Sequence, residues 1–306
     1  MAAIITIPTR SHEEFGHSLN KLLRVLSDLH ACVDNRIILD FNNATMLNPF
    51  FLGGLSCAIH FYKENGKVFE LSKLNNYNIS SYLKAIHFPN RLTPMVEEEE
   101  AFMETLDNYK EKRYIPIIAF PTGGDSAISQ MREKILSAIS GILKKQLNFS
   151  EKNLAPVSYL IDEMTHNVND HSQSPNGSIF AQYYPASNYI DLCICDDGIG
   201  IYKSYNKSLK FHPRTEQEAI EFAINGRSTK DRPEARGFGI STSRSLLVNG
   251  LKGKFFLMSG NTAYIETVEK KGIINLPADL FYHGNYIALR IPTIIEAGFN
   301  IYNYVE

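Results

Sequence analysis

The chain has 306 residues, about two domains in length, and its 31 Lys and Arg against 33 Asp and Glu give a net charge of −2. This balance excludes a strongly basic protein held to nucleic acid by bulk attraction to phosphate, so we expect no nucleic-acid partner. No apolar run reaches the ~18 residues of a membrane span, no signal peptide is evident, and four cysteines are too few for a disulfide scaffold. We therefore expect a cytoplasmic protein with no membrane partner.

The first third of the chain alternates between strand and helix patterns. Apolar runs predict strands at residues 3–8, 36–41 and 67–71. Apolar residues at helical spacing predict helices over 15–29, 49–65 and 79–86. The first helix would be capped by Ser11 with Glu14, and the second by Asn48. Strands that alternate with helices in this way imply crossover units packed on a sheet.

Residues 96–113 differ in composition from the segments on either side, because residues 97–100 are four consecutive Glu and a polar stretch follows them. A solvated helix or linker is the favoured interpretation, and an acidic surface for a partner is the alternative. We therefore place an acidic linker at 96–113, between a domain over 1–95 and a domain over 114–295.

The second part begins with helices and continues mainly as strands. Strands are predicted at 114–120, 178–184, 189–195, 254–258, 263–267 and 286–291. Helices are predicted to follow Asp125 and to cover 154–170, 216–224 and 238–249. This order favours a sheet with helices layered on one face.

A first polar motif lies on the predicted helix over 154–170. Glu163, Asn167 and His171 are spaced by four residues and therefore form one stripe on the helix. Taken alone, the stripe is also typical of the solvent face of an amphipathic helix.

A second motif follows a predicted apolar strand. The strand ends at Asp196, and Gly198 and Gly200 let the backbone turn sharply and approach a ligand closely. A carboxylate at this place can accept a hydrogen bond from an exocyclic amine, and a tight turn with a solvated Asp is the alternative. Cys193 and Cys195 point to one face of the same strand, where we expect them in the core.

A third motif opens the predicted helix over 238–249. Gly237 and Gly239 lie at its start and would leave backbone N–H groups free for an anion. The preceding loop, 226–236, is cationic and rich in hydroxyl groups, so it could fold over phosphates, or else it is a surface loop.

Together and in this order, the motifs resemble those of the GHKL superfamily, which unites gyrase-type, heat-shock-chaperone, histidine-kinase and mismatch-repair ATPases. The resemblance covers about residues 114–293. It extends to a turn from Asn249 to Gly253 and to a last strand from Gly284, where the family usually has Thr at the place of Asn285. It implies an ATP-binding α/β sandwich with Mg²⁺ as cofactor.

The resemblance also implies roles for individual residues at the base of the nucleotide. Asp196 would bind the adenine amino group, and Gly198 and Gly200 would form the turn that lets the base approach. Asn285 would hydrogen-bond to an ordered water or to the base.

Further roles are implied around the phosphates. Glu163 would be the general base that polarises the attacking water, and Asn167 would bind Mg²⁺ through its side-chain oxygen. His171 lies where kinases of this superfamily often carry a basic phosphate contact. The remaining phosphate-binding residues would come from the lid over 226–236 and the glycine motif: Thr229, Lys230, Gly237, Phe238 and Gly239.

The segment over 37–55 resembles a STAS domain, the fold of anti-sigma-factor antagonists. That family has an Asp-Ser-Ser-Gly-like turn before its helix, whereas this chain has an apolar residue near Phe50, so the family's phosphoswitch is not expected here. The expected fold class is thus α/β and α+β, with an N-terminal STAS-like mixed sheet followed by a GHKL sandwich whose helices cover one face of a mixed sheet.

Two functions are compatible with these motifs. The first is a slow, Mg-dependent ATP-hydrolysing regulatory switch, in which the lid couples nucleotide state to the STAS-like domain. The alternative is an anti-sigma-type protein serine/threonine kinase acting on a partner STAS protein. Both imply ATP or ADP and a regulatory protein as partners, and the sequence leaves a homodimer open.

Overall fold

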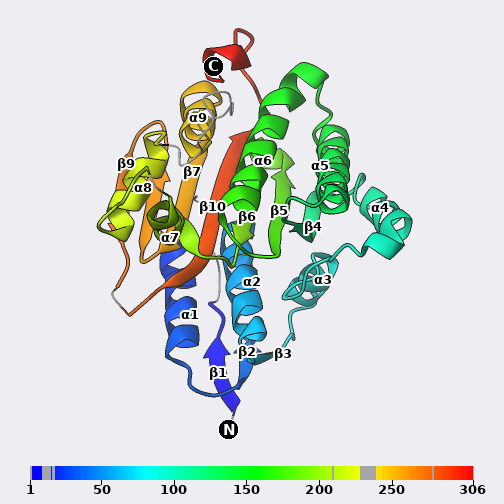
Figure 1. Ribbon diagram of the computed structural model, residues 1–306. Helices are drawn as coiled ribbons and strands as arrows, with labels where there is room; N and C mark the ends of the chain where they lie inside the picture. The colour runs from blue at the N-terminus through cyan, green and yellow to red at the C-terminus, as the bar shows by residue number, and fades with distance from the viewer. Residues whose placement is uncertain are drawn as a thin grey trace.

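The computed structural model describes residues 2–8, 15, 18–208, 210–227, 239–277 and 279–305. In this part of the chain the fold is a mixed α/β arrangement built on two sheets, one of three strands and one of seven. Figure 1 shows the smaller sheet near the N-terminus and the larger sheet above it. None of the helices described is long and apolar enough to cross a membrane.

The small sheet contains β1 (Ala2–Thr6), β2 (Arg36–Asp40) and β3 (Val68–Ser72), which pair in parallel in this order. The crossovers are α1 (Leu19–Ala31) and α2 (Pro49–Glu64), and α3 (Tyr77–Ala85) follows β3. The Asn48 side chain accepts a hydrogen bond from Phe51 N at 3.0 Å and so caps α2, as predicted.

The large sheet has the strand order β4-β5-β6-β10-β7-β8-β9, and all pairs between its strands are antiparallel. Its strands are β4 (Tyr114–Pro121), β5 (Asn176–Tyr184), β6 (Tyr189–Asp196), β7 (Lys254–Gly260), β8 (Thr262–Glu266), β9 (Lys271–Asn275) and β10 (Tyr282–Pro292). The last strand in sequence, β10, therefore lies in the middle, where it joins β6 to β7.

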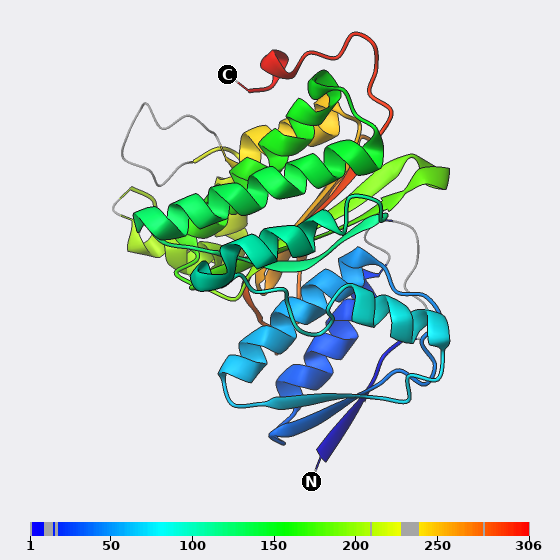
Figure 2. The ribbon, with the colours of Figure 1, turned by 90° about the vertical axis from the view of Figure 1, so that its right-hand side faces the viewer.

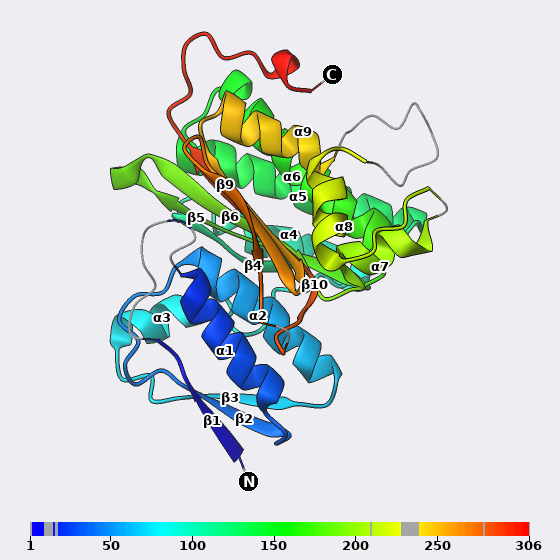
Figure 3. The ribbon, with the colours of Figure 1, turned by 90° about the vertical axis from the view of Figure 1, so that its left-hand side faces the viewer.

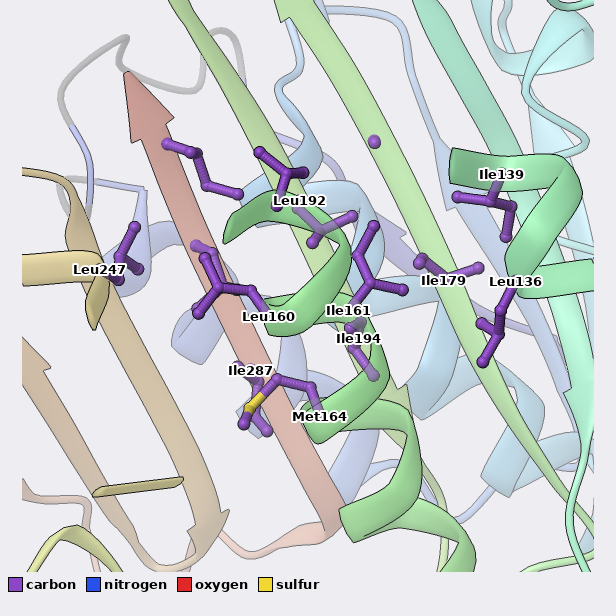
Figure 4. Close-up of a cluster of buried hydrophobic side chains, with 14 of the residues drawn as sticks. Leu136, Ile139, Leu160, Ile161, Met164, Ile179, Leu192, Ile194, Leu247 and Ile287 are labelled. Atoms are coloured by element: carbon purple, nitrogen blue, oxygen red, sulfur yellow. The ribbon is translucent and has the colours of Figure 1, made fainter. Parts of the chain in front are cut away.

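Helices cover one face of the large sheet. They are α5 (Ser126–Leu147), α6 (Glu151–His171), α7 (Gly200–Lys207), α8 (Glu216–Ile224) and α9 (Ile240–Ser245). Figure 4 shows Leu160 and Met164 of α6 lying over the sheet beside Ile194 and Ile287, and all four side chains are buried. Burial of this apolar surface on both partners supplies the main stabilisation of the layer.

The short elements complete the described chain. They are the 3₁₀ segments η1 (Val96–Glu98), η2 (Pro185–Ser187) and η4 (Ile301–Asn303), the π-helical turn η3 (Leu246–Gly250), and α4 (Glu99–Asp107). The segment predicted as an acidic linker thus holds η1 and α4, and Phe102 and Leu106 of α4 are buried in the same core as α5.

The opposite face of the large sheet is covered by α1 and α2, which lie between the two sheets (Figures 2 and 3). In α2, every residue from Pro49 to Ile59 is buried, because the helix has a sheet on either side. The Phe50 ring meets Phe256 of β7 at 4.8 Å between centroids and Tyr286 of β10 at 5.7 Å. The N-terminal segment and the large sheet therefore share one hydrophobic core.

Three expectations need correction. The small sheet is parallel and the large sheet antiparallel between their described strands, so neither is mixed. The large sheet carries helices on both faces, because β6 and β10 are apolar on both sides and need cover on each. The sequence patterns also missed α7 and β9. The proposed capping box of Ser11 and Glu14 lies outside the described residues.

Candidate functional site

An open cavity lies between the large sheet and the helices on its first face, with an empty volume of about 790 Å³ that includes its opening to solvent. Strands β6, β7 and β10 form its floor, and α6, α7, α8 and α9 form its walls. The described residues that line it are Asn167, Val168, His171, Asp196, Gly200, Ile201, Ser204, Tyr205, Ala223, Gly226, Arg227, Gly239, Ile240, Leu257, Asn285 and Ile287.

Asp196 is the carboxylate on the floor of this cavity. It ends β6 and is fully buried. Gly198 N donates a hydrogen bond to Oδ1 at 2.9 Å, and Asn285 Nδ2 donates one to Oδ2, also at 2.9 Å. Burial raises the pKa of Asp196 to about 7, although these two donors act in the opposite direction. The site therefore holds a hydrogen-bond acceptor whose charge is sensitive to its surroundings.

The turn after Asp196 requires glycine at two positions. A Cβ atom on Gly198 would lie 2.0 Å from the Ser172 carbonyl oxygen, so no side chain fits there. Gly200 has φ +75°, a conformation that side chains disfavour, and it begins α7. The turn thus runs tightly against the end of α6, where Ile199 N donates a hydrogen bond to the Ser172 carbonyl oxygen at 2.8 Å.

The polar stripe of α6 reaches the cavity in part. Asn167 and His171 line it, whereas Glu163 is half-buried one turn earlier and is not among the described lining residues. Glu163 lies near Tyr159, whose pKa rises to about 12 through burial and this negative charge. A Cβ atom on Gly239 would lie 3.1 Å from Asn167 Oδ1, so the backbone before α9 lies directly against the Asn167 amide.

Two lining residues carry buried polar atoms without a hydrogen-bond partner in the described part of the chain. They are Asn167 Nδ2 and Asn285 Oδ1. A buried polar atom without a partner costs about 1–3 kcal/mol. Both atoms belong to side chains that line the same cavity, so the cavity has hydrogen-bonding groups that the described residues do not satisfy. A carboxamide oxygen such as Asn167 Oδ1 is also a ligand that Mg²⁺ accepts, together with water and phosphate oxygens.

Several lining residues were missed by sequence reasoning, notably Ser204 and Tyr205 of α7. Tyr205 OH donates a hydrogen bond to the Arg227 carbonyl oxygen at 2.5 Å, and the Arg227 guanidinium lies 4.2 Å from the Phe222 ring centroid. These contacts connect α7 to the segment that follows α8. The apolar spacing of Ile201 and Tyr205 was the available signal for α7, but one turn of it did not suffice.

The cavity brings together six of the predicted site residues, which come from distant parts of the sequence: Asn167, His171, Asp196, Gly200, Gly239 and Asn285. Gly198 contacts Asp196 from the turn, and Glu163 lies one helical turn away. Thr229, Lys230, Gly237 and Phe238 lie outside the described residues, as does most of the predicted lid. Among the residues described, no group of three or more His, Cys, Asp or Glu side chains is placed to hold a metal ion.

Comparisons with known proteins add no relative to this geometry. The chain matches no protein-family model, no curated protein and no solved structure. The resemblances to the GHKL and STAS families therefore depend on the motifs alone.

Proposed function

We propose that the chain binds ATP with Mg²⁺ in the cavity above Asp196 and acts as a slow ATP-hydrolysing regulatory switch. The observation that carries the proposal is the buried Asp196 carboxylate at the end of a central strand, in an open cavity whose other polar groups include Asn167 and His171 of α6 and Asn285 of β10. A buried acceptor in a mainly apolar cavity is suited to the exocyclic amine of a flat base.

The apolar lining supports a base at this end of the cavity. Ile201, Leu257 and Ile287 surround the floor near Asp196, and they would cover the faces of a purine while its amine reaches the carboxylate. Binding the amine would favour the ionised form of Asp196.

The phosphates would lie toward α6 and the backbone at Gly239. Asn167 would hold Mg²⁺ through Oδ1, and His171 would contact a phosphate. When bound, the ion would neutralise charge on the phosphates. Glu163, one turn before Asn167, would accept the proton of the attacking water.

Phosphate transfer to a partner protein is the second candidate function. The observation that favours it is the N-terminal unit itself, in which α1 and α2 cross over a parallel sheet and whose sequence resembles a STAS domain. Phe50 and Phe51 are buried at the start of α2, where that family has its phosphorylated turn. The acceptor would therefore belong to another protein.

Calorimetric titration with Mg·ATP tests the binding proposal. Asp196→Asn should weaken binding by about 1–3 kcal/mol, the usual cost of an unmatched buried polar group. Asp107→Asn is the matched control, because it changes only an exposed ion pair with Lys110. Equal affinity in all three proteins contradicts the assignment of Asp196. With γ-labelled ATP, released phosphate supports the switch, and label on an added protein supports the kinase.

A further inference from the structure

Helix α2 lies against the back of the two strands that carry Asp196 and Asn285. Successive residues of a strand point to opposite faces of the sheet. Asp196 and Asn285 line the cavity, so their neighbours Cys195 and Tyr286 point to the other face, where both are buried in the core shared with α2. Strands β6 and β10 thus form the floor of the cavity with one face and contact α2 with the other.

On the β6 side, α2 holds the residue directly after Asp196. His60 Nδ1 donates a hydrogen bond to Asp197 Oδ2 at 2.6 Å, and Ser174 Oγ donates one to Asp197 Oδ1. Burial would raise the pKa of Asp197, but these hydrogen bonds and the nearby Arg91 outweigh it, so the pKa is lowered and the group is a carboxylate at neutral pH. The turn between β6 and α7 is therefore attached to α2.

On the β10 side, α2 contacts both sides of Asn285. Tyr286 OH donates to the Phe50 carbonyl oxygen at 2.6 Å, and Tyr282 OH donates to the Gly54 carbonyl oxygen at 3.2 Å. The helix can approach this closely because it has glycine here; a Cβ atom on Gly54 would lie 3.1 Å from the Tyr286 ring. These contacts fix the helix over the strands.

We propose that His60 is a positioning residue, which holds Asp197 and thereby fixes the turn over residues 196–200 in the shape that binds nucleotide. The effect of His60 on nucleotide affinity rests on the proposed function, whereas its effect on the shape of the turn does not. His60 does not line the cavity among the described residues. Because linkage between two sites is reciprocal, nucleotide bound at Asp196 would in turn hold α2 more tightly against the sheet.

The experiment compares two substitutions of His60 with a control on the same helix. His60→Leu removes the donor to Asp197, and His60→Asn keeps an N–H close to the place of Nδ1. Lys63→Gln is the control, because Lys63 Nζ donates to Asn90 Oδ1 at 2.7 Å and not to the turn. Amide hydrogen exchange is measured across residues 196–201 in the nucleotide-free proteins, and Mg·ATP affinity is measured by calorimetry.

His60→Leu should raise exchange in the turn and weaken Mg·ATP binding about fivefold or more, the lower end of measured couplings between sites. His60→Asn should restore much of both, which a merely structural role would not predict, and Lys63→Gln should change neither. If the Leu variant does not fold, Asp197→Asn weakens the same contact from the other side. Unchanged exchange in the turn overturns the inference. If the wild type binds no Mg·ATP, the proposed function is overturned, and so is the predicted effect of His60 on nucleotide binding. The hydrogen-exchange result still decides whether His60 positions the turn.

Discussion

Asp196→Asn should make the protein more stable at alkaline pH, apart from its effect on nucleotide. Burial raises the pKa of this carboxyl from 3.8 to about 7. The folded state therefore holds the proton more tightly than the unfolded chain, so the contribution of this group to stability is lost as the pH rises from about 4 through 7. A difference of about three pKa units corresponds to roughly 4 kcal/mol at ~1.4 kcal/mol per unit.

The surroundings of Asp196 accept an amide with little rearrangement. The new side-chain oxygen can accept the Gly198 N–H as the carboxylate does. Its NH₂ group can donate to Asn285 Oδ1, which lacks a partner in the described part of the chain, once the Asn285 amide turns over. The substitution therefore removes the cost of the buried charge, and in the described part of the chain it exchanges the unpartnered Asn285 Oδ1 for an unpartnered Asn285 NH₂ group.

Urea unfolding of both proteins between pH 5 and pH 8 measures the effect. The difference between the two free energies of unfolding is followed, because most other titrating groups contribute equally to both proteins. The variant should gain roughly 2–3 kcal/mol on the wild type across this range. The exposed control Asp107→Asn should show no comparable trend. A difference that does not change with pH would refute a raised pKa at Asp196.

Further substitutions test the chemistry and the core. Glu163→Gln should slow phosphate release ~100-fold and leave the affinity for Mg·ATP nearly unchanged. The control Glu133→Gln, which changes an exposed residue of α5, should alter neither quantity. A wild-type rate in Glu163→Gln would show that Glu163 takes no part in hydrolysis. Asn167→Ala should instead reduce the Mg-dependent part of the affinity in calorimetry, and equal affinity with and without Mg²⁺ in both proteins would count against it. Arg290→Leu should lower the free energy of unfolding by about 3–5 kcal/mol, because the buried Asp191 loses its bidentate partner. Arg290 Nε donates to Asp191 Oδ1 at 2.7 Å, and Arg290 Nη2 donates to Asp191 Oδ2 at 2.8 Å. A decrease below about 1 kcal/mol in urea unfolding would contradict this prediction.

The starts of α2 and α5 were predicted well because their signals are local, whereas α1 was predicted from residue 15 and begins at Leu19. Asp125 accepts a hydrogen bond from Ala127 N at 2.9 Å and begins α5, and Asn48 does the same for α2. The end of β6 was equally predictable, because the sequence shows Asp196 followed by Gly198 and Gly200. The meeting of Asp196 with Asn285 depended on strand order, which comes from pairing between β6 and β10 and was anticipated only through the family resemblance.

Elements with weak patterns were not predicted. Helix α7 is short and mostly polar, and β9 is an edge strand whose residues are at most half-buried, so neither shows a clear apolar period. The second covered face was missed because the two parts were treated as separate domains. Adjacent apolar residues in β6, such as Ile194 and Cys195, were the signal that both faces are covered, because a strand with one solvent-exposed face would alternate between apolar and polar residues.

Because α2 lies between the two sheets, it is synthesised long before the strand that covers one of its faces. Phe50 and its hydrogen-bonding partner Tyr286 are 236 residues apart in the sequence. At ~5–20 residues per second, a ribosome needs roughly ten to fifty seconds to make the chain between them. During that interval the face of α2 that later meets β10 has no strand to cover it. The nascent protein should therefore need protection by chaperones until its last strand is inserted between β6 and β7.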